Sequence, residues 1–599
     1  MKSIRPKRLK SGKPRSCDAC HQRKIHCDIN SPSSSCDWCR HQGILCTFDR
    51  PFGRRSKRKA ASGGNLEGTT GSATGSLYGA STATQVVSRL TPPSSIDQTR
   101  CQNKDLPSQG LGGFYFNGVQ IGGISSNQGI PFFSEQGRDW IYAHTSSRPR
   151  TLEFAQANHV VEVKGTWDLP DQTIVAAYLS VFARSTRRVV FPIIDEESFA
   201  HTTEKAYNKT LDQENPNVAC AKACVLAFTC VMAHMDGVLD VPGAVEAEQC
   251  AARVNRLMPH ILTNPSLCSV QVCTMMCMYN IFSGNVAAAA THLSLAYRFV
   301  SMLGGHVNAQ IAQPQCETAE NRREFIRRVF WHCYMYDKDI CLRAGYPPVI
   351  DDCHCDLGLP PGYKQIDDLD TRQHGPDLIP GDMRLTIIKS KMIGQLYCAR
   401  AFHSSPPELL KSIRELDGEL EMWRMSIPEP YRPELSQSYR ISIEPGWKKS
   451  KQIHVVVIHF EYYFLLAQMH SASGRCRMSL GEIADKARLS SCQALALQAS
   501  RSILSNLAVV SGLFGSGDFW YFILYPMSAS LTIFCNILTS PLNPQAEQDL
   551  ELLNQVPKLI SDMCAIPIGA TERTRLAQVQ QFVEEMLRLS NAALCRHVN

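Results

Sequence analysis

Six cysteines near the start of the chain occur in two copies of one pattern. Residues 17–27 read C-D-A-C-H-Q-R-K-I-H-C, and residues 36–46 read C-D-W-C-R-H-Q-G-I-L-C. Each copy is a Cys-x-x-Cys knuckle separated by six residues from a third cysteine. Thiols packed this densely along a chain are typical of zinc ligands. The repeat therefore predicts a metal site formed by six ligands: Cys17, Cys20, Cys27, Cys36, Cys39 and Cys46.

The number of thiols limits how zinc is bound. Two separate tetrahedral sites would need about eight sulfurs, so six sulfurs can hold two zinc ions only if two are shared. The symmetry of the repeat nominates the first cysteine of each copy, Cys17 and Cys36, as the bridges. A disulfide knot is the alternative, but the first residues, M-K-S-I-R-P-K-R-L-K, lack the apolar stretch of a secretion signal. We expect reduced thiols, and we expect zinc to supply most of the folding free energy of so small a domain.

The two copies differ in their basic residues. Arg23 and Lys24 follow the knuckle of the first copy, where the second copy has Gln42 and Gly43. A short helix beginning near Asp18, whose carboxylate suits an N-cap, would project the basic pair outward. Such side chains in a DNA major groove prefer guanine O6 and N7, so we expect base contacts, with phosphate contact or plain solvation as the alternative. Three further residues are expected to contact phosphates: His21, His26 and Arg40.

Positive charge is concentrated around the cysteines. Residues 1–60 contain 16 Lys and Arg against 4 Asp, a net charge of +12, whereas the rest of the chain has 46 basic and 51 acidic side chains, a net charge of −5. A local excess of this kind neutralises DNA phosphates, although solvated basic tails have the same composition. One basic run also has the composition of a nuclear import signal; its residues are Arg54, Arg55, Lys57, Arg58 and Lys59.

The cysteine spacing (two, six, a variable loop, two, six) resembles that of the fungal zinc binuclear cluster family of transcription factors. The resemblance implies two zinc ions bridged by the first and fourth cysteines, here Cys17 and Cys36. It also implies double-stranded DNA as partner, with a CGG triplet contacted by the basic pair at Arg23 and Lys24, where the family usually has two lysines. A nuclear location and contacts with co-regulators or the transcription machinery are implied in the same way.

Composition divides the chain into four parts: a basic tail over 1–16, the zinc cluster over 17–46, a basic arm and largely disordered linker over 47–164, and a helical domain over 165–599. Gly, Ser, Thr, Gln and Asn dominate from about 60 to 126, which predicts a flexible linker. No heptad pattern follows the cluster, so a coiled-coil dimer is not predicted there. A homodimer and a small-molecule effector are both compatible with the sequence. The aromatic residues of 131–145 suggest docking onto the helical domain.

Helical periodicity dominates the C-terminal part, and alternating strand patterns are scarce, so the predicted fold class is mostly α, with a large all-α domain after the cluster and linker. Helices are expected at 171–184, 219–235, 244–262, 270–282, 287–303, 320–342, 385–402, 408–425, 453–470, 489–511, 521–538, 549–564 and 572–596.

Two stretches of the helical part resemble the fungal-specific middle homology region, a regulatory domain. The better one, over 327–351, reads R-R-V-F-W-H-C-Y-M-Y-D-K-D-I-C-L-R-A-G-Y-P-P-V-I-D; the other, A-Y-R-F-V-S-M-L-G-G-H over 296–306, departs from the family at Gly305. Arg328, Trp331 and Asp337 could form a buried ion pair or a ligand site; ordinary helix packing is the more frequent role of such residues.

Other classes of protein explain the sequence less well. The uncharged run 519–538 is long enough to cross a membrane, but its proline and hydroxyl residues favour a buried core helix, so no membrane partner is expected. Nucleotide-binding, hydrolase and zinc-protease motifs are absent from the sequence, so we predict no enzyme. A zinc-dependent protein-interaction module would leave the local charge and the basic pair unexplained. We therefore expect a DNA-binding transcription factor, and the resemblance implies a metabolic or secondary-metabolite gene set as its target.

Overall fold

The computed structural model describes part of the chain. Near the N-terminus it describes Cys17, Asp18, Cys20, Cys27, Cys36 and Cys39, and further on it describes residues 113–598 apart from 126–129, 151–167, 186–193, 195, 213, 234–244, 309–316, 360–362, 364–380, 437, 477–482, 515–517 and 564–569. The chain forms two compact units, Met1–Gln98 and Thr99–Asn599. The cysteine cluster and the helical domain therefore belong to different units.

A small antiparallel sheet begins the described part of the second unit. β1 (Gly113–Phe116) and β2 (Val119–Gly123) form a hairpin, and β3 (Phe132–Phe133) pairs with the other side of β2. The hairpin turns at Asn117 and Gly118, which both have positive φ. Asn-Gly is the pair that adopts this two-residue turn most readily, because its backbone twist then matches that of the strands.

The sheet and the helix after it form an N-terminal strap (residues 113–125 and 130–150). Helix α3 (Glu135–Thr145) begins at Ser134, whose side chain accepts a hydrogen bond from the Gly137 N–H. The strap packs on distant parts of the chain: the Phe133 ring lies 4.7 Å from that of Phe582. These contacts correct the expected linker and domain boundary, because residues 113–125 bury apolar side chains against the helical domain rather than forming a linker.

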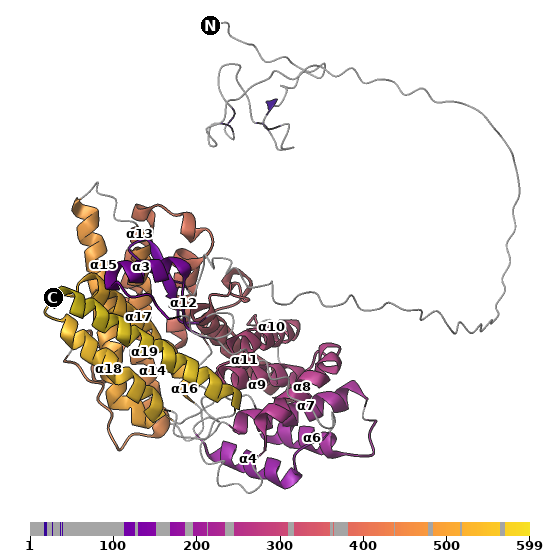
Figure 1. Ribbon diagram of the computed structural model, residues 1–599. Coiled ribbons are helices and arrows are strands. Elements are labelled where there is room, and N and C mark those ends of the chain that lie inside the picture. The colour runs from indigo at the N-terminus through magenta and orange to yellow at the C-terminus, as the bar shows by residue number, and fades with distance from the viewer. Residues whose placement is uncertain are drawn as a thin grey trace, which may run out of the picture. The chain divides into compact units, whose positions relative to one another are not determined.

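The helical domain begins with a group of helices drawn in magenta tones in Figure 1. In chain order they are α4 (Gln172–Arg184), α6 (Glu196–Tyr207), α7 (Pro216–Met232), α8 (Ala247–Leu262), α9 (Leu267–Phe282), α10 (Val286–Met302) and α11 (Glu317–Ala344). Helix α7 packs against α6, α8 and α9, and α10 packs against α9 and α11. α7 and α9 are apolar almost all round, so they are buried at the centre of the group.

The second group of helices is coloured orange to yellow in Figure 1. It consists of α12 (Met383–Met392), α13 (Pro406–Met425), α14 (Lys449–Ser471), α15 (Ile483–Val510), α16 (Phe519–Phe522), α17 (Leu524–Thr539), α18 (Ala546–Met563) and α19 (Ala570–Val598). α17 packs against α14, α15, α18 and α19, and α11 joins the groups through α12. One continuous apolar core runs through both groups.

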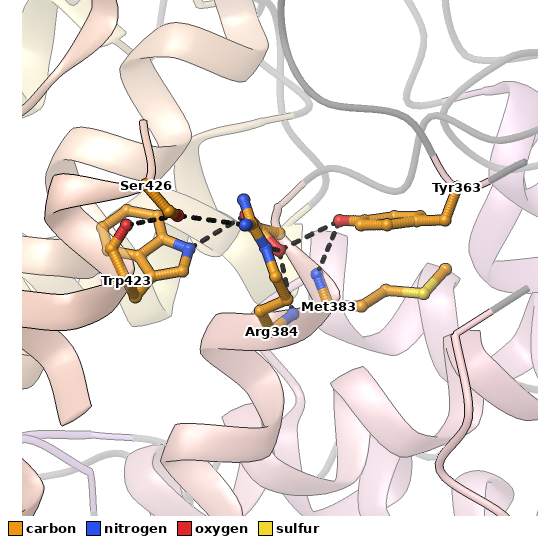
Figure 2. Close-up of polar contacts among 6 residues, drawn as sticks. Tyr363, Met383, Arg384, Trp423 and Ser426 are labelled. Atoms are coloured by element: carbon orange, nitrogen blue, oxygen red, sulfur yellow. Dashed lines mark hydrogen bonds and ion pairs between the residues drawn. The ribbon is translucent and has the colours of Figure 1, made fainter. Parts of the chain in front are cut away.

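The start of α12 is fixed by a buried polar network (Figure 2). Asp382, the N-cap of α12, is 4% exposed. Its carboxylate accepts hydrogen bonds from the Tyr363 hydroxyl at 3.0 Å and the Trp423 indole N–H at 2.9 Å, as well as from Arg384. Arg384 in turn donates to the Ser426 hydroxyl at 3.0 Å. Burial alone would raise the pKa of Asp382, but the hydrogen bonds and the charge of Arg384 outweigh burial and lower it.

The predicted mostly helical fold class is confirmed. Every helix expected from periodicity overlaps an observed one. The expected helix 385–402 instead ends as α-helix at Met392 and continues as a π-helical turn over Ile393–Tyr397. Helices α3 and α6 were not predicted. The three-stranded sheet was not predicted either, so the domain is mostly rather than entirely helical.

The long uncharged segment forms α16 and α17, with a break at Ile523. Among the described residues it is the one helical segment, Phe519–Thr539, with the length and apolarity to cross a membrane, and 83% of its most apolar window is buried inside the protein. Helix α17 packs against α14, α15, α18 and α19, so the segment serves as a core element of the domain.

Candidate metal centre

Four cysteine sulfurs converge in the N-terminal unit. The Sγ atoms of Cys17, Cys20, Cys36 and Cys39 all lie within 4.8 Å of one another, and these four side chains are at most 2% exposed. Cys17 Sγ lies 3.8 Å from Cys36 Sγ and 3.6 Å from Cys39 Sγ, and Cys20 Sγ lies 3.6 Å from Cys36 Sγ. Cys27 packs against this group. The two knuckles, separate in sequence, thus form one cluster of sulfurs.

The local backbone of both knuckles is the same. The Cys20 N–H donates to Cys17 Sγ at 3.4 Å, and the Cys39 N–H donates to Cys36 Sγ at 3.4 Å. Cys20 and Cys39 are helical, whereas Cys17 and Cys36 are not. Asp18 is itself helical, so it lies inside the first turn and is not the expected N-cap; Cys17, directly before the helix, has that position. A carboxylate in the first turn still suits the positive end of the helix dipole.

The sulfur spacing fits zinc. Zinc–sulfur bonds of about 2.3 Å in a tetrahedron place two sulfurs roughly 3.8 Å apart. The observed separations of 3.6 to 3.8 Å match that edge. They are far longer than the roughly 2.05 Å of a disulfide, and all of these cysteines are free. The disulfide alternative is therefore wrong for the described cysteines.

The electrostatics of the thiols also call for a cation. Burial, followed by the neighbouring sulfurs, raises the pKa of Cys20 and Cys39 well above the usual thiol value. Thiolates this close repel one another in the absence of positive charge. A bound divalent cation offsets this repulsion, lowers the pKa of the coordinating thiols and holds them deprotonated.

Several predicted site residues lie outside the described residues. These are the sixth cysteine, the DNA-contacting residues and the basic run: Cys46, His21, Arg23, Lys24, His26, Arg40, Arg54, Arg55, Lys57, Arg58 and Lys59. Most of the expected linker lies outside them as well.

The motif of 327–351 fixes the chain after α11. Asp337 is 2% exposed, and its carboxylate lies 3.0 Å from Lys338 Nζ. The same carboxylate accepts hydrogen bonds from the Val349 and Ile350 N–H groups at 2.8 and 3.2 Å, and Lys338 donates to the Ile350 carbonyl at 2.7 Å. Burial raises the pKa of Asp337 despite these partners. The buried pair therefore holds the proline-containing turn against the helix.

The suggested ion pair between Arg328 and Asp337 is wrong. Arg328 lies over the Phe325 ring. It is about two and a half helical turns from Asp337, so the two side chains point to opposite faces of α11. Arg327 makes the backbone contacts instead, donating to the carbonyls of Gly305 and Asp356. Gly305, where the second motif departs from the family, has no room for a side chain: an added Cβ would lie 2.6 Å from Ile326 Cγ2.

A second buried charge cluster was not predicted. Lys389 Nζ lies 2.7 Å from Asp339 Oδ1 and 2.6 Å from Glu461 Oε1, and all three side chains are at most 8% exposed. One ammonium cannot balance two carboxylates, and burial, with the charge of Asp339, raises the pKa of Glu461 to about 7 despite Lys389. The sequence signal for this cluster was a charged residue on the apolar face of each of the three helices that form it, α11, α12 and α14.

Sequence comparisons agree with this architecture. The chain combines a zinc-binding cysteine module with a large helical domain that follows it in sequence. DNA-binding regulators with zinc clusters belong to this class of protein. Residues 15–55 match the fungal Zn(2)-Cys(6) binuclear cluster domain, which binds two zinc ions, and residues 179–425 match the fungal specific transcription factor domain. Two domain models of fungal transcription factors thus match this chain, first the zinc cluster domain and then the fungal specific transcription factor domain.

The relatives found by sequence comparison are fungal proteins that carry the names of transcription factors. ABC-transporter-regulating transcription factors of Aspergillus fumigatus and Aspergillus oryzae are each 28% identical, over 77% of this chain and 53% of their own length. A fusaridione A cluster transcription factor of Fusarium heterosporum is 23% identical over 56% of this chain and 61% of its own. The chain thus spans about half the length of the two Aspergillus relatives. No solved structure matches it.

Proposed function

We propose that the chain is a nuclear, sequence-specific DNA-binding transcription factor that reads CGG-type triplets through its two-zinc cluster. The observation that carries the proposal is the convergence of the described cysteine sulfurs at the spacing of a zinc tetrahedron, inside the matched zinc cluster domain. The net charge of +12 over residues 1–60 supports DNA rather than a protein as the partner of this unit.

The residue roles follow from the repeat. Cys17, Cys20, Cys27 and Cys36 would hold one zinc ion, and Cys17, Cys36, Cys39 and Cys46 would hold the other, with Cys17 and Cys36 shared. The short distances from Cys36 to Cys20 and from Cys17 to Cys39 support this division. Bound zinc supplies positive charge and a fixed fold for the unit; the chain's own side chains read the DNA.

Arg23 and Lys24 are proposed to contact bases, because only the first copy of the repeat has a basic pair there. His21, His26 and Arg40 are proposed to contact phosphates. The basic run from Arg54 to Lys59 would direct nuclear import.

The gene set is proposed to include transporters or a metabolite cluster. The support is the names of the relatives, an ABC-transporter regulator and a fusaridione A cluster regulator. Genome-wide occupancy of the tagged protein, with a cysteine-cluster variant as control, would identify the target genes directly.

The first test is Lys24→Ala in the full-length, zinc-loaded protein. Loss of a base contact should weaken binding to a CGG site by roughly 1–3 kcal/mol. Fluorescence anisotropy against a CGG duplex and a scrambled duplex measures both affinity and selectivity. Gln42→Ala, at the corresponding region of the second copy, is the matched control and should leave both unchanged. Unaltered selectivity of Lys24→Ala would contradict direct readout by this residue.

A further inference from the structure

A groove of about 790 Å³ lies in the helical domain. Ligand sites in proteins commonly enclose a volume of this order, about 300–1,000 Å³. One wall is a stripe of α15 at helical spacing, namely Ser490, Gln493, Ala494, Leu497, Gln498 and Arg501. The opposite walls come from α17, from the end of α14 and from strand β1 of the N-terminal strap. Four elements that are distant in sequence therefore meet around one space.

Three side-chain amides of the groove have their nitrogens engaged. Gln493 Nε2 donates to Asn117 Oδ1 at 2.9 Å, Gln498 Nε2 donates to the Leu435 carbonyl at 3.0 Å, and Asn536 Nδ2 donates to Asp549 Oδ2 at 3.1 Å. Their carbonyl oxygens have no hydrogen-bond partner among the described residues. Because the engaged nitrogens fix the amide orientation, the groove offers a set of preoriented acceptors, which favour a ligand with several O–H or N–H donors.

The groove carries little net charge. Arg501 is the charged side chain among its described lining residues. It is 7% exposed and forms a bidentate pair with Asp549, Nε to Oδ1 at 2.6 Å and Nη2 to Oδ2 at 2.8 Å. The carboxylate neutralises the guanidinium, and the remaining nitrogen, Nη1, has no partner among the described residues. An ionised ligand would lose hydration in this groove without gaining an opposite charge.

We propose that this groove binds a neutral small molecule rich in hydroxyl groups, of the sugar or polyol class. Its hydroxyls donate to the amide oxygens of Gln493, Gln498 and Asn536 and accept from Arg501 Nη1. Its C–H face packs against the apolar side chains of Phe114 and Leu497, which also line the groove. Small-molecule sites combine apolar walls with a few placed polar groups in this way.

Binding would also stabilise the N-terminal strap, because β1 forms a wall of the groove. The strap already contacts the wall at the end of α14, where the Gly118 N–H donates to the Gly474 carbonyl at 2.6 Å. A ligand that contacts β1 and α15 together adds a second connection. Amide hydrogen exchange of β1 and β2 should therefore slow on binding. A role of this ligand as a regulator of transcription rests on the function proposed above, but binding itself does not.

The experiment uses the full-length, zinc-loaded protein and saturation-transfer NMR with sucrose, trehalose and mannitol as neutral probes. Gluconate and glucosamine are the charged comparators. Ala494→Trp places an indole in the groove from an exposed position of α15; Ala508→Trp, exposed on the same helix outside the groove, is the matched control. At least one neutral probe should bind, and Ala494→Trp should weaken it by about tenfold or more while Ala508→Trp does not.

Three outcomes would overturn the site: no neutral probe binds at millimolar concentration, a charged comparator binds in preference, or the two tryptophan variants bind alike. Melting temperatures of both variants show whether each is folded. Binding of CGG DNA is measured on the same samples. In the unsubstituted protein, absence of sugar binding with intact DNA binding rejects the groove, whereas intact sugar binding without selective DNA binding rejects the proposed function.

Discussion

Cys17 and Cys36 occupy central positions among the described thiols. Each is the first cysteine of its copy, each accepts the N–H of its own knuckle at 3.4 Å, and the two sulfurs lie 3.8 Å apart. Each also lies 3.6 Å from the second cysteine of the opposite copy. This crossed arrangement is what two tetrahedra that share an edge require. A terminal ligand, in contrast, needs to belong to only one of the two tetrahedra.

Substitution of a shared ligand should therefore differ from substitution of a terminal one. Cys17→Ser or Cys36→Ser should release both zinc ions, whereas Cys20→Ser or Cys39→Ser should release no more than one. The zinc content of each purified variant, measured by native mass spectrometry, tests this. Retention of two ions by Cys17→Ser or Cys36→Ser would contradict the proposed bridges.

At the scale of elements, the N-terminal strap depends on close backbone approaches. Gly137 in α3 lies so near β2 that an added Cβ would be 1.8 Å from the Ile121 carbonyl oxygen. Ser134 fixes the start of α3, and Phe133 packs between the rings of Phe534 and Phe582. The sheet thus holds the first described part of the second unit against its last helices.

Gly137→Ala should detach or destabilise the strap, at a cost of about 1–3 kcal/mol, because the carbonyl belongs to the backbone and cannot move aside alone. Hydrogen exchange over 113–145 should accelerate. Gly418→Ala in α13 is the control, because an added Cβ there meets no atom within 4 Å. That variant should be neutral or more stable, since alanine is the better helix former. Equal exchange rates in the two variants would show that the close approach of α3 to β2 does not limit the stability of the strap.

At the scale of the whole molecule, buried charges join helices far apart in sequence. Lys389 of α12 contacts Asp339 of α11 and Glu461 of α14, so one ammonium links three helices. The pKa of Glu461, about 7, lies above its ordinary value of 4.5. The folded state therefore holds a proton that the unfolded state has released between these two values.

The free energy of unfolding should accordingly decrease as pH rises from about 4.5 to 7, by at most about 1.4 kcal/mol per pH unit from this group. Glu461→Gln should remove that part of the pH dependence, because glutamine does not titrate. Urea unfolding of the helical domain at a series of pH values measures the slope. Glu415→Gln, a surface glutamate whose side chain is 58% exposed, should leave the slope unchanged. An unchanged slope in Glu461→Gln would exclude this residue as its source.

Much of the fold was predictable because its signals are local. Each helix predicted from periodicity overlaps an observed one, because the buried face of an amphipathic or fully apolar helix is visible in its own sequence. The hairpin also had a local signal, Asn117-Gly118 between apolar residues, but the Gly- and Ser-rich composition around it outweighed that signal. Helix α6 was missed because much of its surface is polar and it buries few apolar residues.

By itself, the sequence determined the zinc cluster and its class, because six ligands spaced within thirty residues can meet without help from distant chain. Tertiary structure alone decided the rest of the chemistry. It paired Asp337 with Lys338 rather than Arg328, and it brought Lys389 to residues 50 and 72 positions away. It also assembled the groove from β1, α14, α15 and α17. Such contacts depend on how helices pack, and the periodicity of one helix carries no information about which residues of another helix it will face.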